Sequence, residues 1–190
     1  MTRHGYAIFD TGIGRCGIAW GELGIVGVQL PETREIETRR GVLQQYPEAR
    51  ELHPSASVEL AIEGITALVR GQPADLSHVR LDMSAIKHFN QRVYALTRAI
   101  PYGETRTYAE LAAGLKLPGA LHSVAEALGR NPFVIIVPCH RVLEAGGDAG
   151  RSSRNAGVIS KRRLLSIEGA RSGKTLFDVL LPVAPRRPPG

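Results

Sequence analysis

The sequence predicts an α+β protein, with a small N-terminal sheet domain that also carries helices and a mostly helical C-terminal domain. Three observations predict this class. Short apolar or alternating segments, separated by glycine-rich turns, fill residues 6–29. Apolar side chains at helical spacing follow in several later segments. The length of 190 residues, with 43% hydrophobic residues, is enough for one domain or two small ones.

The first half of the chain is expected to form an antiparallel meander accompanied by helices. The turn sequences at 11–14 and 21–24 are rich in glycine, and Pro31 ends the strand pattern. Cys16 lies within a strand-like segment, where packing in the core is the expected role. The elements predicted here are strands at 6–10, 16–20 and 25–29, helices at 32–50 and 57–70, and a last strand at 79–82.

The second half is expected to be helical. Ser84 is the predicted N-cap of its first helix, and Thr107 with Glu110 fits the capping box of the next one. Two short helices joined by a glycine-containing turn are typical of a helix-turn-helix, and a plain helical hairpin is the alternative. The predicted elements are helices at 85–100, 107–115, 120–130 and 160–168, with the turn at 116–119. The predicted division is a scaffold domain at 1–82, a helix-turn-helix domain at 84–170 and a tail at 171–190.

Charge is distributed unevenly along the chain. The net charge is +6, but residues 1–82 hold 8 Lys and Arg against 11 Asp and Glu, whereas residues 83–190 hold 16 against 7. The basic second half is therefore the part predicted to bind a polyanion such as nucleic acid, with an ordinary solvated basic surface as the alternative.

The composition also bears on the compartment. No apolar run approaches the ~20 residues that span a bilayer, and the N-terminus has no signal-peptide core. The two cysteines are far apart, which favours neither a disulfide framework nor a zinc cluster. We therefore expect a cytoplasmic protein that contacts no membrane and holds no metal.

The segment Asn131–Arg141 contains the strongest chemical signal. An apolar run over 133–137 predicts a short buried strand or extended segment, and Pro138 ends it. Cys139 follows at once, beside two side chains that can carry positive charge. Such neighbours favour the reactive thiolate, so Cys139 is a candidate nucleophile; a small, inert core residue is the alternative.

The full string Asn-Pro, an apolar run, then Pro-Cys-His-Arg-Val resembles the active-site signature of the O6-alkylguanine-DNA alkyltransferases, also called methylated-DNA–protein-cysteine methyltransferases. The resemblance covers residues 89–169 and includes Ile-Pro-Tyr-Gly-Glu-Thr-Arg-Thr-Tyr at 100–108 and Leu-Leu-Ser-Ile-Glu-Gly at 164–169. It implies a ribonuclease-H-like N-terminal domain and DNA repair by transfer of an alkyl group to a cysteine that stays alkylated.

Alkyl transfer to a thiol needs a nucleophile, a base, an orienting group and an acid. The resemblance and this requirement assign the same residues. Cys139 is the expected acceptor, His140 the base acting through a bridging water, and Glu168 the group that fixes the His140 tautomer. Tyr108 is expected to give a proton to the leaving base, and Asn131 to join the second short helix to the nucleophile segment.

The resemblance further implies a monomer that needs no cofactor and binds the minor groove of double-stranded DNA bearing O6-alkylguanine in the bacterial nucleoid. The damaged nucleotide is flipped into the pocket. The residues expected at DNA are His122, Ser123, Ala125, Ala127, Arg130 and Arg141, and those expected in the base pocket are Val142, Ser152 and Ser153.

Two departures from the family pattern stand out. His122 occupies the position at which the family usually has an arginine that enters the base stack. The loop after the cysteine, at 150–157, is longer than the family's loop and lacks its usual tyrosine. These departures leave two alternatives open: a non-catalytic alkyltransferase-like protein that flags damage, and a regulator that uses only the helix-turn-helix.

Overall fold

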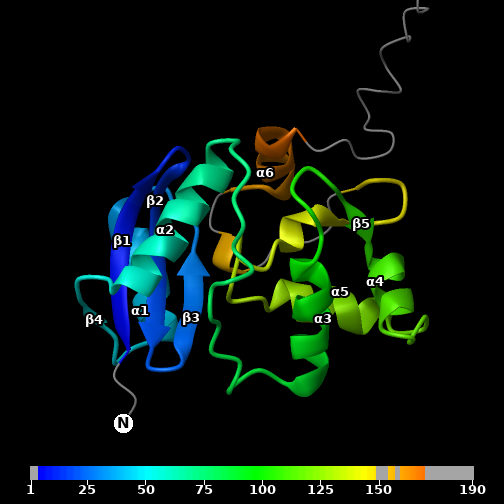
Figure 1. Cartoon of the computed structure of the whole chain (residues 1–190), viewed down its shortest axis with the longest axis horizontal. Coiled ribbons are helices and arrows are strands. Elements are labelled where there is room, and N and C mark those ends of the chain that lie inside the picture. The colour runs from blue at the N-terminus through cyan, green and yellow to red at the C-terminus, as the bar shows by residue number, and fades with distance from the viewer. Residues whose placement is uncertain (1–3, 149–153, 157–158, 170–190) are drawn as a thin grey trace, which may run out of the picture.

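The computed structural model describes residues 4–148, 154–156 and 159–169. Figure 1 shows a sheet half and a helical half side by side, with α6 (Lys161–Glu168) above and between them. This arrangement confirms the α+β class, while the likeness to ribonuclease H stays a prediction. Within the ranges described, no helix has the length and apolar character needed to cross a bilayer.

The sheet half is built on the predicted meander. β1 and β2 pair antiparallel from Gly5 opposite Trp20 to Thr11 opposite Gly14, and the sheet order is β3-β2-β1-β4. The two-residue strand β4, parallel to β1, was not expected. The elements of this half are β1 (Gly5–Thr11), β2 (Gly14–Gly21), β3 (Gly24–Gln29), α1 (Glu35–Gln45), β4 (Arg50–Glu51) and α2 (Ala56–Val69).

The two helices of this half cover opposite faces of the sheet, as the alternation of strand side chains requires. Val42 of α1 packs with Ala19 in one small cluster, whereas Ile65 of α2 shares the main core with Ile18. Close approach of α1 explains a glycine: a Cβ at Gly17 would meet Val42 Cγ2 at 2.5 Å.

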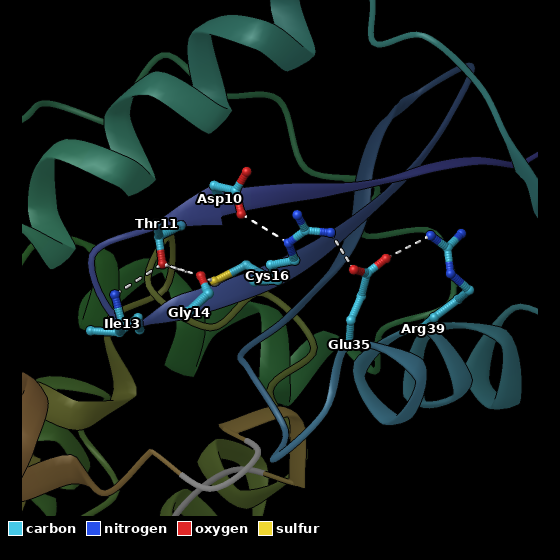
Figure 2. Close-up of polar contacts among 8 residues, drawn as sticks. Asp10, Thr11, Ile13, Gly14, Cys16, Glu35 and Arg39 are labelled. Carbon is cyan, nitrogen blue, oxygen red and sulfur yellow. Dashed lines mark hydrogen bonds and ion pairs between the residues drawn. The ribbon is translucent and has the colours of Figure 1, made fainter.

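Charged side chains hold α1 against the sheet at the surface. Glu35 pairs with Arg39 of the same helix at 3.1 Å, as Figure 2 shows, and with Arg15 of β2. Arg15 Nε also lies 3.0 Å from Asp10 Oδ1. Arg39 reaches further, to the carboxylate of Glu51 in β4 at 2.5 Å. The network therefore connects α1 to three strands.

Two predictions about the connection between the halves were wrong. Residues 79–82 form no strand; Leu81 makes only an isolated bridge with Ile25. Ser84 caps no helix, because its backbone N–H and hydroxyl both donate to Asp82 Oδ1 and α3 begins only at His88.

In the helical half, α4 begins at the capping box that the sequence predicted, and α6 lies within the predicted helix at 160–168. Thr107 and Glu110 form the capping box of α4, Ser160 accepts from Arg163 N at the start of α6, and Gly169 ends α6 with φ +61°. A two-residue parallel pair, β5 with β6, was not expected. The remaining elements are α3 (His88–Arg98), β5 (Arg106–Thr107), α4 (Tyr108–Gly114), α5 (Leu121–Gly129), η1 (Cys139–Arg141), β6 (Val142–Leu143) and η2 (Arg154–Ala156).

The apolar run at 133–137 is buried, but it is not the predicted strand. It makes a turn in which Val134 bridges Val137 and Ile135 takes a φ of +72°. The edge strand β3 contacts this turn, since Val28 N donates to the carbonyl of Pro132 at 2.8 Å. The sheet therefore supports the segment that leads to Cys139. The predicted tail at 171–190 lies outside the described residues.

Candidate active site

Cys139 is the first residue of the short helix η1, and the turn before it is pinned at both ends. Asn131 Nδ2 donates to the carbonyl of Val137 at 2.9 Å, while Asn131 Oδ1 accepts from the N–H of Phe133 at 2.9 Å. Both bonds are buried, so the amide joins the end of α5 to the residues just before the cysteine. Cys139 itself is 5% exposed.

The η1 turn directs His140 toward the last turn of α6. His140 Nε2 lies 2.7 Å from Glu168 Oε1, and the two side chains are 3% and 5% exposed. Glu168 thus lies beside the imidazole to which the sequence assigned it. Hydrogen bonding through Nε2 leaves Nδ1 as the other ring nitrogen for proton transfer.

Arg141 corrects one of the sequence predictions. Expected at the DNA surface, it is instead 6% exposed and turned inward. Its Nε lies 2.9 Å from Glu168 Oε2, its Nη2 lies 2.8 Å from Glu168 Oε1, and its Nη1 donates to the carbonyl of Ile100 at 2.8 Å. These bonds occupy the guanidinium, so Arg141 fixes Glu168.

The buried groups shift one another's protonation. Burial favours the neutral form of Glu168, but hydrogen bonds from His140 and Arg141 overcome this and lower its pKa to about 2. Burial lowers the pKa of His140, and Arg141 and Lys161 lower it further against the opposing effect of Glu168. Near pH 7 the site therefore holds an ionised Glu168 and a neutral His140.

Lys161 is a site residue that the sequence reasoning missed. It is 3% exposed, and its Nζ donates to Tyr108 Oη at 2.9 Å and to the carbonyl of Val142 at 3.0 Å. In the sequence, Lys161 is the first residue of a basic run, Lys-Arg-Arg at 161–163. The signal was the helical spacing: Lys161, Leu164 and Glu168 lie at i, i+3 and i+7, hence on one face of α6.

Two opposing influences act on the thiol. Burial raises the pKa of Cys139, whereas a hydrogen bond with Asn131 and the charge of Lys161 lower it. Burial also raises the pKa of Tyr108 to about 12, so its phenol keeps its proton near pH 7. The site thus offers a thiol with a nearby cation and a protonated phenol bonded to that same cation.

Most of the residues predicted to contact DNA in and just after α5 are exposed, but one is buried. His122, Ser123 and Arg130 are exposed, and Ala125 is partly so. Ala127 was expected at DNA, but it is 2% exposed, and its carbonyl accepts from Tyr94 Oη at 2.9 Å.

The base-pocket predictions are only partly within the described chain. Ser152 and Ser153 lie outside the described residues. Val142 is fully buried in β6 and does not line the cavity beside Cys139. That cavity has a volume of about 10 Å³. Within residues 4–148, 154–156 and 159–169, no three His, Cys, Asp or Glu side chains gather as a metal site would require.

Comparisons with known proteins agree on one family. A sequence model described as the DNA-binding domain of 6-O-methylguanine DNA methyltransferase matches residues 88–170. The chain is 33% identical over 153 residues to the methylated-DNA–protein-cysteine methyltransferase of Methanothermobacter thermautotrophicus, covering 80% of this chain and 78% of the relative. It is 41% identical over 120 residues to the protein of that name from Mycobacterium tuberculosis, covering 62% and 70%. The crystal structure of Mycobacterium tuberculosis OGT in complex with DNA matches with a TM-score of 0.69 and 32% identity, covering 88% of this chain and 94% of that chain.

Proposed function

This chain belongs to the family of methylated-DNA–protein-cysteine methyltransferases and serves DNA repair by direct alkyl transfer, and we propose that Cys139 accepts the alkyl group from O6-alkylguanine in double-stranded DNA. One observation carries the assignment. Cys139 opens η1, and the same turn brings His140 within 2.7 Å of a buried carboxylate on α6. Cys16, the other cysteine, is fully buried within β2, with a pKa raised to about 12 by burial.

The reaction requires the thiol proton to leave first. In the proposed step, His140 Nδ1 takes the proton of Cys139 through a bridging water, and the Nε2–H of the imidazolium donates to ionised Glu168. The thiolate then attacks the alkyl carbon. The S–C bond forms, the C–O bond breaks, and its electron pair passes to the guanine.

The departing guanine needs a proton. Tyr108 supplies it from its phenol, and the tyrosinate that results is stabilised by the Nζ of Lys161 at 2.9 Å. Lys161 also offsets the negative charge of the Cys139 thiolate before the alkyl group is transferred. Arg141 and Glu168 neutralise each other, so the charge of Lys161 adds to that of the imidazolium in stabilising the thiolate of Cys139. The alkylated sulfur of Cys139 has no S–H left to ionise, so it cannot form a thiolate again. Each protein molecule therefore acts once.

We assign DNA binding to α4 and α5 as a helix-turn-helix at the minor groove. The net positive charge of the second half, the exposed His122 and Ser123 on α5, and the exposed Arg130 that caps its end support this. The similar Mycobacterium tuberculosis OGT, whose crystal structure is a complex with DNA, adds to the support. His122 takes the place of the stacking arginine as the nucleotide flips out. The protein acts as a monomer, without a cofactor, at the bacterial nucleoid in the cytoplasm.

Intact-mass measurement tests the assignment. Incubation with a duplex bearing O6-methylguanine is expected to add one methylene to the wild-type protein and nothing to Cys139→Ala. Binding of the damaged duplex without a mass change would instead indicate an alkyltransferase-like protein that flags damage. Equal affinity for damaged and undamaged duplexes, without a mass change, would indicate a helix-turn-helix regulator.

A further inference from the structure

The sheet half contributes a wall of the cavity beside the nucleophile. Leu30, the residue after β3, lines this cavity together with Cys139 and His140, although more than 100 residues separate them in sequence. The remaining described lining is mostly aliphatic. It consists of Val134, Ile135, Ala156, Ile159, Lys161 and Leu164.

Leu30 is held in place by main-chain and side-chain bonds from η2. Its N–H donates to the carbonyl of Asn155 at 2.9 Å. Asn155 is 3% exposed, and its Nδ2 donates to the carbonyl of Val28 at 3.0 Å while its Oδ1 accepts from Gln45 at 3.0 Å. The wall is therefore fixed to β3 and α1.

The volume of the cavity and the chemistry of its lining limit which chemical group it can hold. Its volume of about 10 Å³ matches one water-sized group. Six of the nine described lining residues are aliphatic, which favours an apolar occupant beside the wall that Leu30 forms. A methyl group has the right size and polarity. A guanine ring is far too large, so it has to bind beyond this cavity while only its alkyl group enters.

We propose that Leu30 is a specificity-determining residue that limits the size of the alkyl group Cys139 accepts. This inference rests on the proposed function. After transfer, the new S–C bond leaves the alkyl group on Sγ, where the cavity accommodates a methyl group without movement of its walls. A larger group meets Leu30, and that wall cannot retreat easily because Asn155 holds it. The substrate class is therefore DNA with small O6-alkyl groups.

The test compares Leu30→Ala and Leu30→Val with wild type on duplexes bearing O6-methylguanine or O6-benzylguanine. The measured quantity is the ratio of the benzyl to the methyl transfer rate, followed by intact mass. Ile18→Ala is the matched control, because Ile18 is as fully buried as Leu30, loses the same number of carbons and does not line the cavity. Thermal unfolding of each variant is recorded beside the rates.

Removing the wall is expected to raise the rate ratio at least about tenfold in Leu30→Ala, since a few methylenes in an apolar pocket discriminate on that scale. Leu30→Val is expected to give a smaller rise, and Ile18→Ala none. If Leu30→Ala does not fold, the rise in Leu30→Val decides the matter. An unchanged ratio in a folded Leu30 variant that still accepts methyl would overturn the inference and leave the proposed function intact. Absence of methyl transfer in wild type would instead overturn the proposed function.

Discussion

Arg141 binds both carboxylate oxygens of Glu168, at 2.8 and 2.9 Å, while His140 Nε2 lies 2.7 Å from one of them. The carboxylate therefore serves two partners on the same short helix, η1. Two adjacent residues of the nucleophile segment are tied to the last turn of α6, and this pairing fixes both the charge of Glu168 and the orientation of His140.

Glu168→Gln should therefore impair both stability and reaction. The change leaves the buried guanidinium of Arg141 without its counter-ion, which we expect to lower the free energy of unfolding by about 3 kcal/mol. Loss of the imidazolium partner should slow methyl transfer by about a hundredfold or more. Denaturant unfolding and single-turnover rates measure the two effects. Glu59→Gln is the control, because Glu59 is an exposed carboxylate of α2, outside the site and outside the helices assigned to DNA, and the change should affect neither quantity.

The stability of the wild-type protein should fall in acid over a defined range. The folded pKa of Glu168 is about 2, below its ordinary value of 4.5. Its stabilising effect is therefore complete above pH 4.5 and is lost as pH falls toward 2, amounting to about 3 kcal/mol. The lowered pKa of His140 adds a loss that begins below its ordinary value of 6.5. Urea unfolding across pH measures this. A Glu168→Gln protein with the same acid slope as wild type would contradict it.

Lys161→Met should make the thiol harder to ionise. The charge of Lys161 lowers the pKa of Cys139, so its removal should raise that pKa and move the pH dependence of methyl transfer to higher pH. We expect transfer at pH 7 to slow at least about tenfold. Arg163→Met removes an exposed cation from the same helix and should leave the pH profile unchanged. An identical profile for Lys161→Met would remove Lys161 from the reaction.

His122→Arg should accelerate repair of duplex DNA more than reaction with free O6-methylguanine base. An arginine is longer than histidine and always charged, so it fills the space left by a flipped base more completely; we expect about a tenfold gain on duplex. His88→Arg adds the same charge to another exposed position of the helical half and serves as the control. Equal gains on both substrates would show that His122 has no part in flipping.

The sequence predicted elements whose signals are local. The meander follows from alternation and glycine turns, α4 follows from the capping box at Thr107, and α6 follows from the apolar residues within 160–168. Elements whose conformation depends on tertiary partners were predicted wrongly or not at all. The apolar run at 133–137 is buried by its surroundings on every side, so composition could not distinguish a strand from a turn. β4, β5 and β6 have two residues each and exist only through their partner strands.

The site was predictable as far as its motif, but not its buried charges. Cys139, His140 and Glu168 were named from the motif, whereas Arg141 was assigned to DNA and Lys161 was missed. Arginine and lysine are usually exposed. Only the fold shows that Arg141 is buried against Glu168 and that Lys161 is buried against Tyr108. Leu30 carries no chemical signal at all, because its place beside the nucleophile arises from the contact of β3 with η2.

Peptide mapping after single turnover tests the central assignment most directly. The wild-type protein is incubated with excess duplex bearing O6-methylguanine, digested and analysed by mass spectrometry. We predict one methyl group per molecule, located on the peptide that contains Cys139, with the Cys16 peptide unmodified. A methyl group on any other residue, or repeated turnover by a protein whose Cys139 stays a free thiol, would contradict the account.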